Sequence, residues 1–229
     1  MANPIINHPD IPVLHNDEFL KISYLEGEGD FCIVTFIGVG LGLGGVDIQS
    51  EEFKKINPAL GNQVFIFDKQ RSWGNNLDMA QIRDLIAPLT AGRRVVTMGL
   101  SMGGFLAIMG SSALDAETTI AMAPQYSVCP MVMPQENRWV AYTRKVRRWK
   151  VKSVDGFFND ETRYHCLFTD IRLETRHLDR FPRAGNISLY KVRGPIHNVG
   201  QVLKDQGLLY PTIEACIAGE APPILPIEG

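Results

Sequence analysis

Residues 95–109 read VVTMGLSMGGFLAIM. The first part of this stretch is apolar and rich in β-branched side chains, which is typical of a buried strand. A glycine, a serine and two more glycines follow, and a segment rich in Ala, Leu and Met begins directly after them. The stretch therefore predicts a strand, a sharp turn at Ser101 and a helix.

Ser101 is the central residue of a Gly-x-Ser-x-Gly pattern. A serine between a strand end and a helix start has a strained backbone, so glycines are needed where a Cβ would strike a neighbour. The helix N-terminus beside it offers free N–H groups and the positive end of the helix dipole. We expect Ser101 to attack a carbonyl and the Met102 N–H to stabilise the resulting oxyanion. The alternative is an ordinary serine in a glycine-rich turn.

The composition is that of an ordinary globular protein. The 229 residues are 45% hydrophobic and 21% charged, and the formal net charge is -2. This length suits one domain, so we expect residues 1–229 to form a single α/β domain. The charge argues against nucleic acid as the main partner.

The cysteines and the apolar runs indicate the cellular compartment that we expect for the protein. Cys32, Cys129, Cys166 and Cys216 are scattered without the spacing of metal ligands, which favours a reducing environment and no metal site. The first twenty residues do not resemble a signal peptide, and no apolar run approaches the ~20 residues of a spanning helix. We therefore expect a cytoplasmic protein without a membrane partner.

Apolar runs alternate with helical patterns along the chain. We expect strands at 18–24, 31–37, 64–67, 94–100, 118–122, 164–169 and 187–192, and helices at 48–56, 77–89, 102–109, 174–181 and 199–209. The first two strands should form an N-terminal hairpin. The alternation predicts a three-layer α/β/α sandwich with a mostly parallel sheet. Residues 129–159 lack a strand pattern, so we expect a small cap or lid there.

A serine that transfers acyl groups needs a base and an acid that orients it. His8 and His15 precede the sheet, His165 lies in an apolar strand and His177 in a predicted helix. Only His197 is in a loop after the last predicted strand, from which it can return to the carboxyl edge of the sheet. We therefore expect His197 to be the base.

Two carboxylates compete for the role of the acid. Asp170 directly follows a predicted strand, which places it at the same edge of the sheet as Ser101. Glu174 begins the next predicted helix, where a carboxylate also favours the helix dipole. We expect Asp170 to orient His197, with Glu174 as the alternative.

The glycine-rich loop after residues 31–37 has two interpretations. As an oxyanion loop it supplies the second N–H donor from Gly38, Val39 or Gly40. As a dinucleotide fingerprint it matches in form, with glycines at 40, 42 and 45 and Asp68 about twenty residues further on. That interpretation leaves Ser101 and His197 unexplained, so we favour the oxyanion loop and expect no dinucleotide or other cofactor.

The Gly99–Gly104 turn, the acid-then-histidine order and the strand pattern resemble the α/β-hydrolase superfamily over nearly the whole chain. Within it, the motifs at 67–73, 99–104, 123–125 and 197–199 look like a little-characterised bacterial group, sometimes found beside capsular polysaccharide genes. The resemblance implies a serine hydrolase that forms an acyl-enzyme on a small or glycan-attached ester. A binding or scaffold protein on the same fold is the alternative, and a dinucleotide-binding protein is a weaker one.

Overall fold

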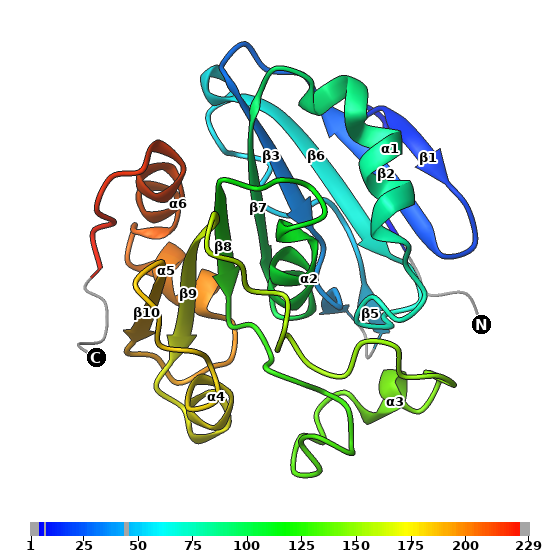
Figure 1. Cartoon of the computed structure of the whole chain (residues 1–229), viewed down its shortest axis with the longest axis vertical. Coiled ribbons are helices and arrows are strands. Elements are labelled where there is room, and N and C mark those ends of the chain that lie inside the picture. Colours follow the sequence, from blue (N-terminus) through cyan, green and yellow to red (C-terminus); the bar gives the residue numbers. More distant parts are fainter. Residues whose placement is uncertain (1–4, 7, 44–45, 225–229) are drawn as a thin grey trace.

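The computed structural model describes residues 5–6, 8–43 and 46–224. These residues form an eight-stranded sheet in the order β1-β2-β6-β3-β7-β8-β9-β10 and a small sheet of β4 and β5 (Figure 1). The strands are β1 Val13–Asn16, β2 Leu20–Leu25, β3 Phe31–Phe36, β4 Leu41–Leu43, β5 Val46–Ile48, β6 Gly61–Asp68, β7 Arg94–Leu100, β8 Thr118–Met122, β9 Arg163–Thr169 and β10 Ile187–Val192. From β6 to β10 every neighbouring pair in the large sheet is parallel, as predicted.

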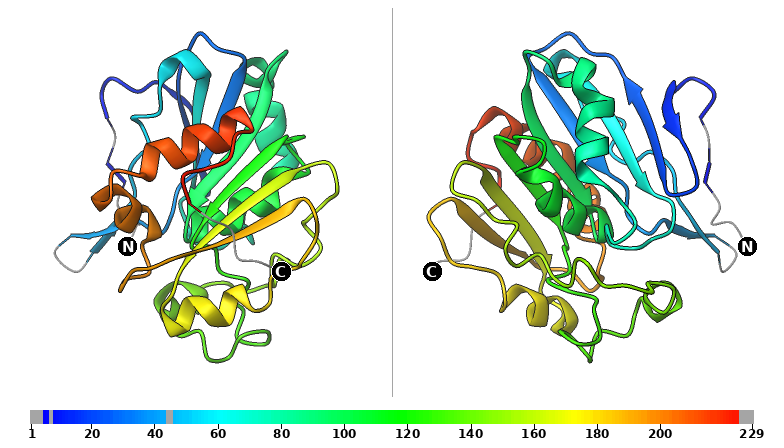
Figure 2. Two further views of the ribbon diagram at one scale, coloured as in Figure 1. Left: turned by 90° about the vertical axis from the view of Figure 1, so that its left-hand side faces the viewer. Right: turned by 45° about the vertical axis from the view of Figure 1, so that its right-hand side comes forward.

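Helices cover both faces of the sheet, which confirms the predicted three layers (Figure 2). The helices are α1 Met79–Thr90, α2 Met102–Ser111, α3 Val140–Thr143, α4 Arg172–Leu178, α5 Val199–Asp205, α6 Leu209–Ala218 and the short 3₁₀ helix Pro58–Leu60. Val34 and Phe36 pack in one core with α1 and α2, whereas Ile33 and Val96 pack in another with α5 and α6. Because both faces are covered, the central strands are apolar without alternation.

The expected hairpin between residues 18–24 and 31–37 does not form, because β2 pairs with β6 and not with β3. β1 pairs antiparallel with β2, and β2 pairs antiparallel with β6, so β6 separates β2 from β3. β3 is buried on both faces and needs parallel neighbours in the middle of the sheet, which it finds in β6 and β7.

No helix forms at residues 48–56, where one was expected. Gln49 and Glu51 are buried, and each bonds into the core: Gln49 Nε2 donates to the Gly38 carbonyl, and Glu51 accepts from Lys21 Nζ. A regular helix here would turn these polar side chains away from their partners, so tertiary contacts override the local propensity.

The turn at Ser101 has the predicted geometry. Ser101 has φ 58° and ψ -118°, and α2 begins at the next residue. A Cβ on Gly99 would lie 2.4 Å from the Gly103 carbonyl carbon, and one on Gly103 would lie 2.1 Å from the Phe36 oxygen. Both glycines are therefore required by the close approach of strand and helix backbones.

Gly103→Ala tests this requirement. Since the new methyl would overlap backbone atoms of β3, we expect the free energy of unfolding to fall by at least about 2 kcal/mol. Gly185→Ala is the control, because a Cβ there meets no atom within 4 Å. Thermal unfolding of the two variants measures the difference. Equal melting temperatures would show that the elbow backbone can shift to accept a side chain.

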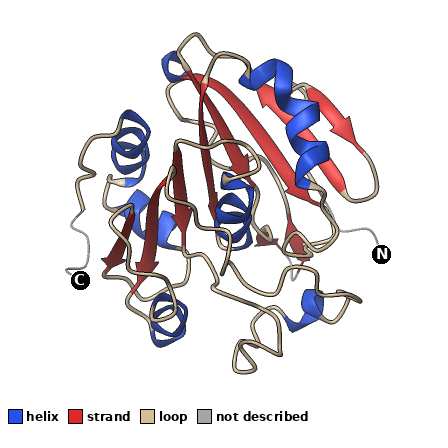
Figure 3. Cartoon of the chain, in the orientation of Figure 1, coloured by secondary structure: helices blue, strands red, loops and turns tan. Residues whose placement is uncertain are grey.

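The loops and short helices that follow β8, β9 and β10 gather at the carboxyl edge of the sheet. Residues 123–162 are almost entirely loop, with α3 as the helix within them (Figure 3). α4 lies at the same edge, below β9 in Figure 1. In the described part of the chain, no helix has the length and apolar character needed to cross a membrane.

Candidate active site

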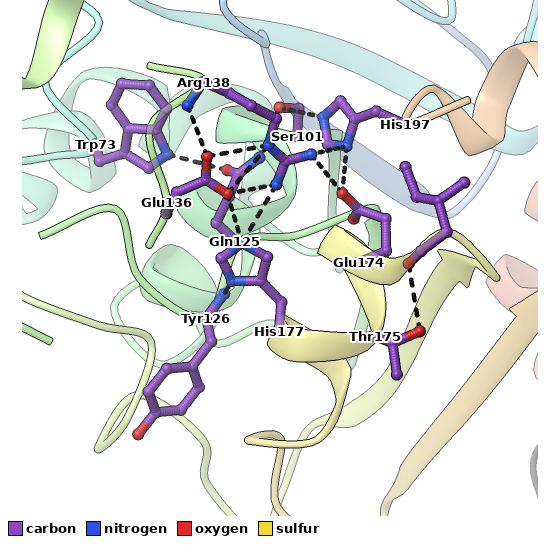
Figure 4. Close-up of polar contacts among 11 residues, drawn as sticks. Trp73, Ser101, Gln125, Tyr126, Glu136, Arg138, Glu174, Thr175, His177 and His197 are labelled. Atoms are coloured by element: carbon purple, nitrogen blue, oxygen red, sulfur yellow. Dashed lines mark hydrogen bonds and ion pairs between the residues drawn. The ribbon is translucent and has the colours of Figure 1, made fainter. Parts of the chain in front are cut away.

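Ser101, His197 and Glu174 form a chain of hydrogen-bonding distances at the carboxyl edge of the sheet (Figure 4). His197 Nε2 lies 2.9 Å from Ser101 Oγ, and His197 Nδ1 lies 2.8 Å from Glu174 Oε1. Ser101 is 6% exposed and Glu174 is fully buried, while the His197 side chain is 22% exposed. The sequence therefore predicted correctly that Ser101 and His197 lie together, from segments that are far apart in the chain.

The expectation that Asp170 contacts His197 is wrong. The Asp170 carboxylate accepts the N–H of Gly194 at 3.0 Å and thereby ties the end of β9 to the loop after β10. Glu174 lies in the first turn of α4, and this turn brings its longer side chain under the His197 ring. Glu174, the alternative acid in the sequence analysis, therefore has the position needed to orient His197.

Glu174 is also paired with Arg138, a residue that the sequence analysis did not single out. Arg138 Nη1 donates to Glu174 Oε1 at 2.6 Å, and its Nε and Nη2 donate to Glu136 at 3.0 and 2.5 Å. Burial raises the pKa of Glu174, but the His197 hydrogen bond and charge, with the Arg138 charge, outweigh it and keep that pKa below its usual value. The carboxylate that faces His197 is therefore ionised at neutral pH.

His177 completes this network as a neutral ring. Its Nδ1 accepts the Tyr126 backbone N–H at 3.0 Å, so Nε2 carries the proton and donates to Glu136 at 2.8 Å. Arg138 is then the cation shared between two buried carboxylates. Burial of this kind is tolerated because each charge is paired and hydrogen bonded.

The change in the free energy of unfolding at acid pH should reflect the ionisation of the Glu136 carboxyl. Burial raises its pKa, but the hydrogen bonds from His177 and Arg138 dominate and lower it from 4.5 to about 2. A lowered carboxyl pKa stabilises the fold above the unfolded value, and this contribution is lost as the pH falls from about 4.5 to about 2. The shift corresponds to about 3 kcal/mol.

We expect Glu136→Gln to be less stable than the wild type at pH 7, with the difference shrinking toward pH 2. Denaturant unfolding at a series of pH values measures this. A difference that does not change with pH would assign the stabilisation to packing rather than to the ionised carboxylate.

The loop after β3 presents backbone groups next to the elbow. The Gly38 N–H donates to Glu52 Oε2 at 3.4 Å. Among the described residues, the N–H groups of Val39 and Met102 have no acceptor. The Gly40 N–H likewise has no acceptor among the described residues, so of the expected oxyanion donors Gly38 is the one with a competing bond.

Buried side chains fix the carbonyls of the same loop. Gln49 Nε2 donates to the Gly38 carbonyl at 2.8 Å, and Arg71 Nε donates to the Val39 carbonyl at 3.1 Å. Gly40 has φ 121°, and a Cβ there would lie 2.6 Å from the Ile48 carbonyl. The loop is therefore held on both sides, and Gly40 serves the turn into β4.

The dinucleotide interpretation fits neither the loop nor Asp68. Gly42 lies within strand β4, and strand β5 follows where the fingerprint requires a helix; residues 44 and 45 lie outside the described residues. Asp68 is buried, and its Oδ2 accepts the Ser72 N–H and hydroxyl at 2.8 Å and the Gly74 N–H at 3.1 Å. Asp68 thus holds the loop of residues 69–76 and is not available to a ribose.

Among the residues that the structure describes, no cluster of three or more His, Cys, Asp or Glu side chains could hold a metal ion. The four cysteines are buried and unpaired.

A second residue, which the sequence analysis included in the motif at 123–125 without assigning it a role, contacts Ser101 itself. Gln125 Nε2 donates to Ser101 Oγ at 2.9 Å, and Gln125 Oε1 accepts the indole N–H of Trp73 at 3.0 Å. Gln125 follows β8, the neighbour of the elbow strand. Its position after a parallel strand was a usable signal, because the carboxyl ends of such strands meet at one edge.

Comparisons with known proteins identify the fold. No protein-family model and no curated protein matches the chain. The structure is similar to the capsule O-acetyltransferase of Neisseria meningitidis serogroup A, with TM-score 0.65 and 12% identity, covering 93% of this chain and 96% of that one. It is similar to Est1E from Butyrivibrio proteoclasticus, with TM-score 0.61 and 12% identity, covering 91% and 99%.

A third similar structure is the carboxylesterase CesB from Bacillus subtilis, with TM-score 0.53 and 10% identity, covering 93% of this chain and 92% of that one. The similarity to each of these three structures covers more than nine-tenths of this chain. The parallel sheet, the strained elbow after β7 and the histidine loop after the last strand are arranged as the resemblance implied. The chain therefore has the α/β-hydrolase fold.

Proposed function

We propose that this protein is a serine acyl hydrolase that cleaves a small or glycan-attached ester through an acyl-enzyme. The observation that carries the proposal is the chain from Ser101 Oγ through His197 to Glu174, with distances of 2.9 and 2.8 Å. A serine hydroxyl is a weak nucleophile, and a neighbouring base with an oriented ring is what activates it.

In the proposed reaction, Ser101 Oγ bonds to the acyl carbon as its proton passes to His197 Nε2. The carbonyl π electrons move to the oxygen, where the N–H groups of Met102 and Val39 would donate to the negative charge. The charge on Glu174 stabilises the imidazolium that forms. His197 then gives the proton to the leaving alcohol, and water attacks the acyl-enzyme by the same route in reverse.

A cavity beside this machinery offers space for part of a substrate. Its volume is about 330 Å³, and Leu100 and Asn198, the chain neighbours of Ser101 and His197, are among its lining residues. Phe53 and Leu209 are apolar lining residues of this cavity, and Lys204 is a charged one. This size supports a small acyl or alcohol group, in line with the carboxylesterase among the similar structures.

The similarity to a capsule O-acetyltransferase supports a second candidate, transfer of the acyl group to a sugar hydroxyl instead of water. The two reactions share the acyl-enzyme and differ in the acceptor. In neither do we propose a cofactor, nucleic acid or membrane as a partner, because the chain of three side chains supplies the chemistry.

We further propose that residues 129–159 form a cap over the site and belong to the same domain as the sheet. Arg138 and Glu136 come from this segment and bond to Glu174 and His177. The Trp139 ring lies 5.8 Å from that of His197. The cap would thus be held to the catalytic groups by charge pairs.

Reaction of the purified protein with a fluorophosphonate probe tests the proposal, because only an activated serine is labelled. Hydrolysis of p-nitrophenyl acetate, butyrate and octanoate then ranks the acyl chain. Added sugar acceptors that divert the acyl group from water would favour the transferase. A folded protein that reacts with no probe and no ester would instead be a binding protein on a hydrolase fold.

A further inference from the structure

Gln125 is held in one orientation between Trp73 and Ser101. The indole Nε1–H can only donate, so the atom of Gln125 that faces it must be the carbonyl oxygen, at 3.0 Å. The amide nitrogen therefore faces Ser101 Oγ, at 2.9 Å. Trp73 and Gln125 are fully buried, so water does not compete for either bond.

This contact fixes what each electron pair of Ser101 Oγ can do. With Glu174 on Nδ1 of His197, Nε2 is the acceptor and takes the hydroxyl proton. Gln125 occupies one lone pair of the oxygen. One lone pair then remains to bond to an acyl carbon.

We propose that Gln125 is a catalytic residue that donates to the Ser101 oxygen, and that Trp73 is the positioning residue that keeps its amide turned that way. The inference rests on the proposed function of Ser101. As the hydroxyl proton moves to His197 Nε2, its bonding pair stays on Oγ, and the free lone pair forms the bond to the acyl carbon. The Gln125 N–H stabilises the charge that develops on Oγ during this transfer and is itself neither gained nor lost.

The contacts from Trp73 to Gln125 and from Gln125 to Ser101 give the buried indole N–H of Trp73 a role. Trp73 has φ 50°, and its loop is held by the hydrogen bonds to Asp68 described above. That loop therefore aims the indole N–H at Gln125. A phenylalanine would fill much of the same space but would leave the amide free to rotate.

The first test compares the rate constants of fluorophosphonate labelling for the wild type and Gln125→Met. Loss of a donor to a developing oxyanion lowers rates by roughly 100-fold, and we expect a fall of that size. Gln81→Met on the exposed face of α1 is the control and should label at the wild-type rate. Thermal unfolding of each variant confirms that the protein is folded.

Gln125→Glu separates a donor from a mere spacer. The carboxylate can still accept the Trp73 N–H, but its other oxygen would accept the Ser101 proton and draw it away from His197. We expect slower labelling than in Gln125→Met at pH 8. As the pH falls and the carboxyl is protonated, it regains a donor, so the ratio of variant to wild-type rate should rise. A ratio that is constant with pH would overturn the donor role.

Trp73→Phe tests the positioning role by a double-mutant cycle. We expect about a tenfold loss in the wild-type background and no further loss when Gln125→Met is already present, because Trp73 acts through Gln125. Equal losses in both backgrounds would overturn the link. A wild-type protein that does not label overturns the proposed function and the role of Gln125 with it, whereas equal labelling of wild type and Gln125→Met overturns this inference alone.

Discussion

Ser101→Ala is expected to abolish fluorophosphonate labelling and to lower ester hydrolysis by on the order of a million-fold. The hydroxyl is the only atom in the arrangement placed to bond to the acyl carbon, and alanine leaves His197 with no proton to accept. The melting temperature should change little, because the gain from no longer burying a hydroxyl is offset by the loss of the acceptor of the buried Gln125 amide. Labelling measured by in-gel fluorescence and hydrolysis of p-nitrophenyl acetate give the two readouts.

Ser112→Ala is the matched control, since Ser112 is exposed and lies at the opposite end of α2 from Ser101. It should label and turn over as the wild type does. Persistent labelling of Ser101→Ala would move the nucleophile to another residue and would remove the basis for the roles of His197 and Glu174.

The second large effect is expected from Glu174→Gln, with a loss of about ten-thousand-fold in turnover. Glu174 Oε1 contacts both His197 Nδ1 and Arg138 Nη1. A neutral amide with its carbonyl oxygen at that position would no longer stabilise the imidazolium. Its carbonyl oxygen can still accept from Arg138, so the charge pair with Glu136 remains and the protein should fold.

Asp170→Asn is the paired comparison, and it should remain within a few-fold of wild type. The asparagine carbonyl can accept the Gly194 N–H as the carboxylate does. Steady-state kinetics and thermal unfolding of both variants decide between the two acids. A large loss in Asp170→Asn with a nearly active Glu174→Gln would reverse the assignment and require the loop after β10 to rearrange in the working enzyme.

The fold and the elbow could be predicted because their determinants are local. The strand of β7, the glycines and the start of α2 lie within sixteen residues, and Gly99 and Gly103 are needed for backbone contacts that any such turn makes. The apolar runs within β3, β6 and β7 similarly required a sheet covered on both faces. His197 could be found because it alone of the five histidines follows the last strand.

The errors arose where a choice between neighbours depended on three-dimensional position. Asp170 and Glu174 are four residues apart, and both lie shortly after the end of β9. Only the direction in which α4 leaves the strand brings Glu174 to His197 and leaves Asp170 with Gly194. The missing helix at 48–56 has the same cause, because Gln49 and Glu51 bond to groups from distant strands.

Residues 95–109 and the alternation of strands and helices thus determined the α/β sandwich, the strained serine and the edge of the sheet at which the site lies. Which side chains join Ser101 and His197 in the site follows from the tertiary structure: Gln125 from the loop after β8 contacts Ser101, and Glu174 from α4, paired with Arg138 from residues 129–159, contacts His197. The spacing of apolar residues along the sequence indicates which face of a helix or strand is buried. It does not record which polar groups from separate loops meet, because those contacts depend on loop paths that no local pattern specifies.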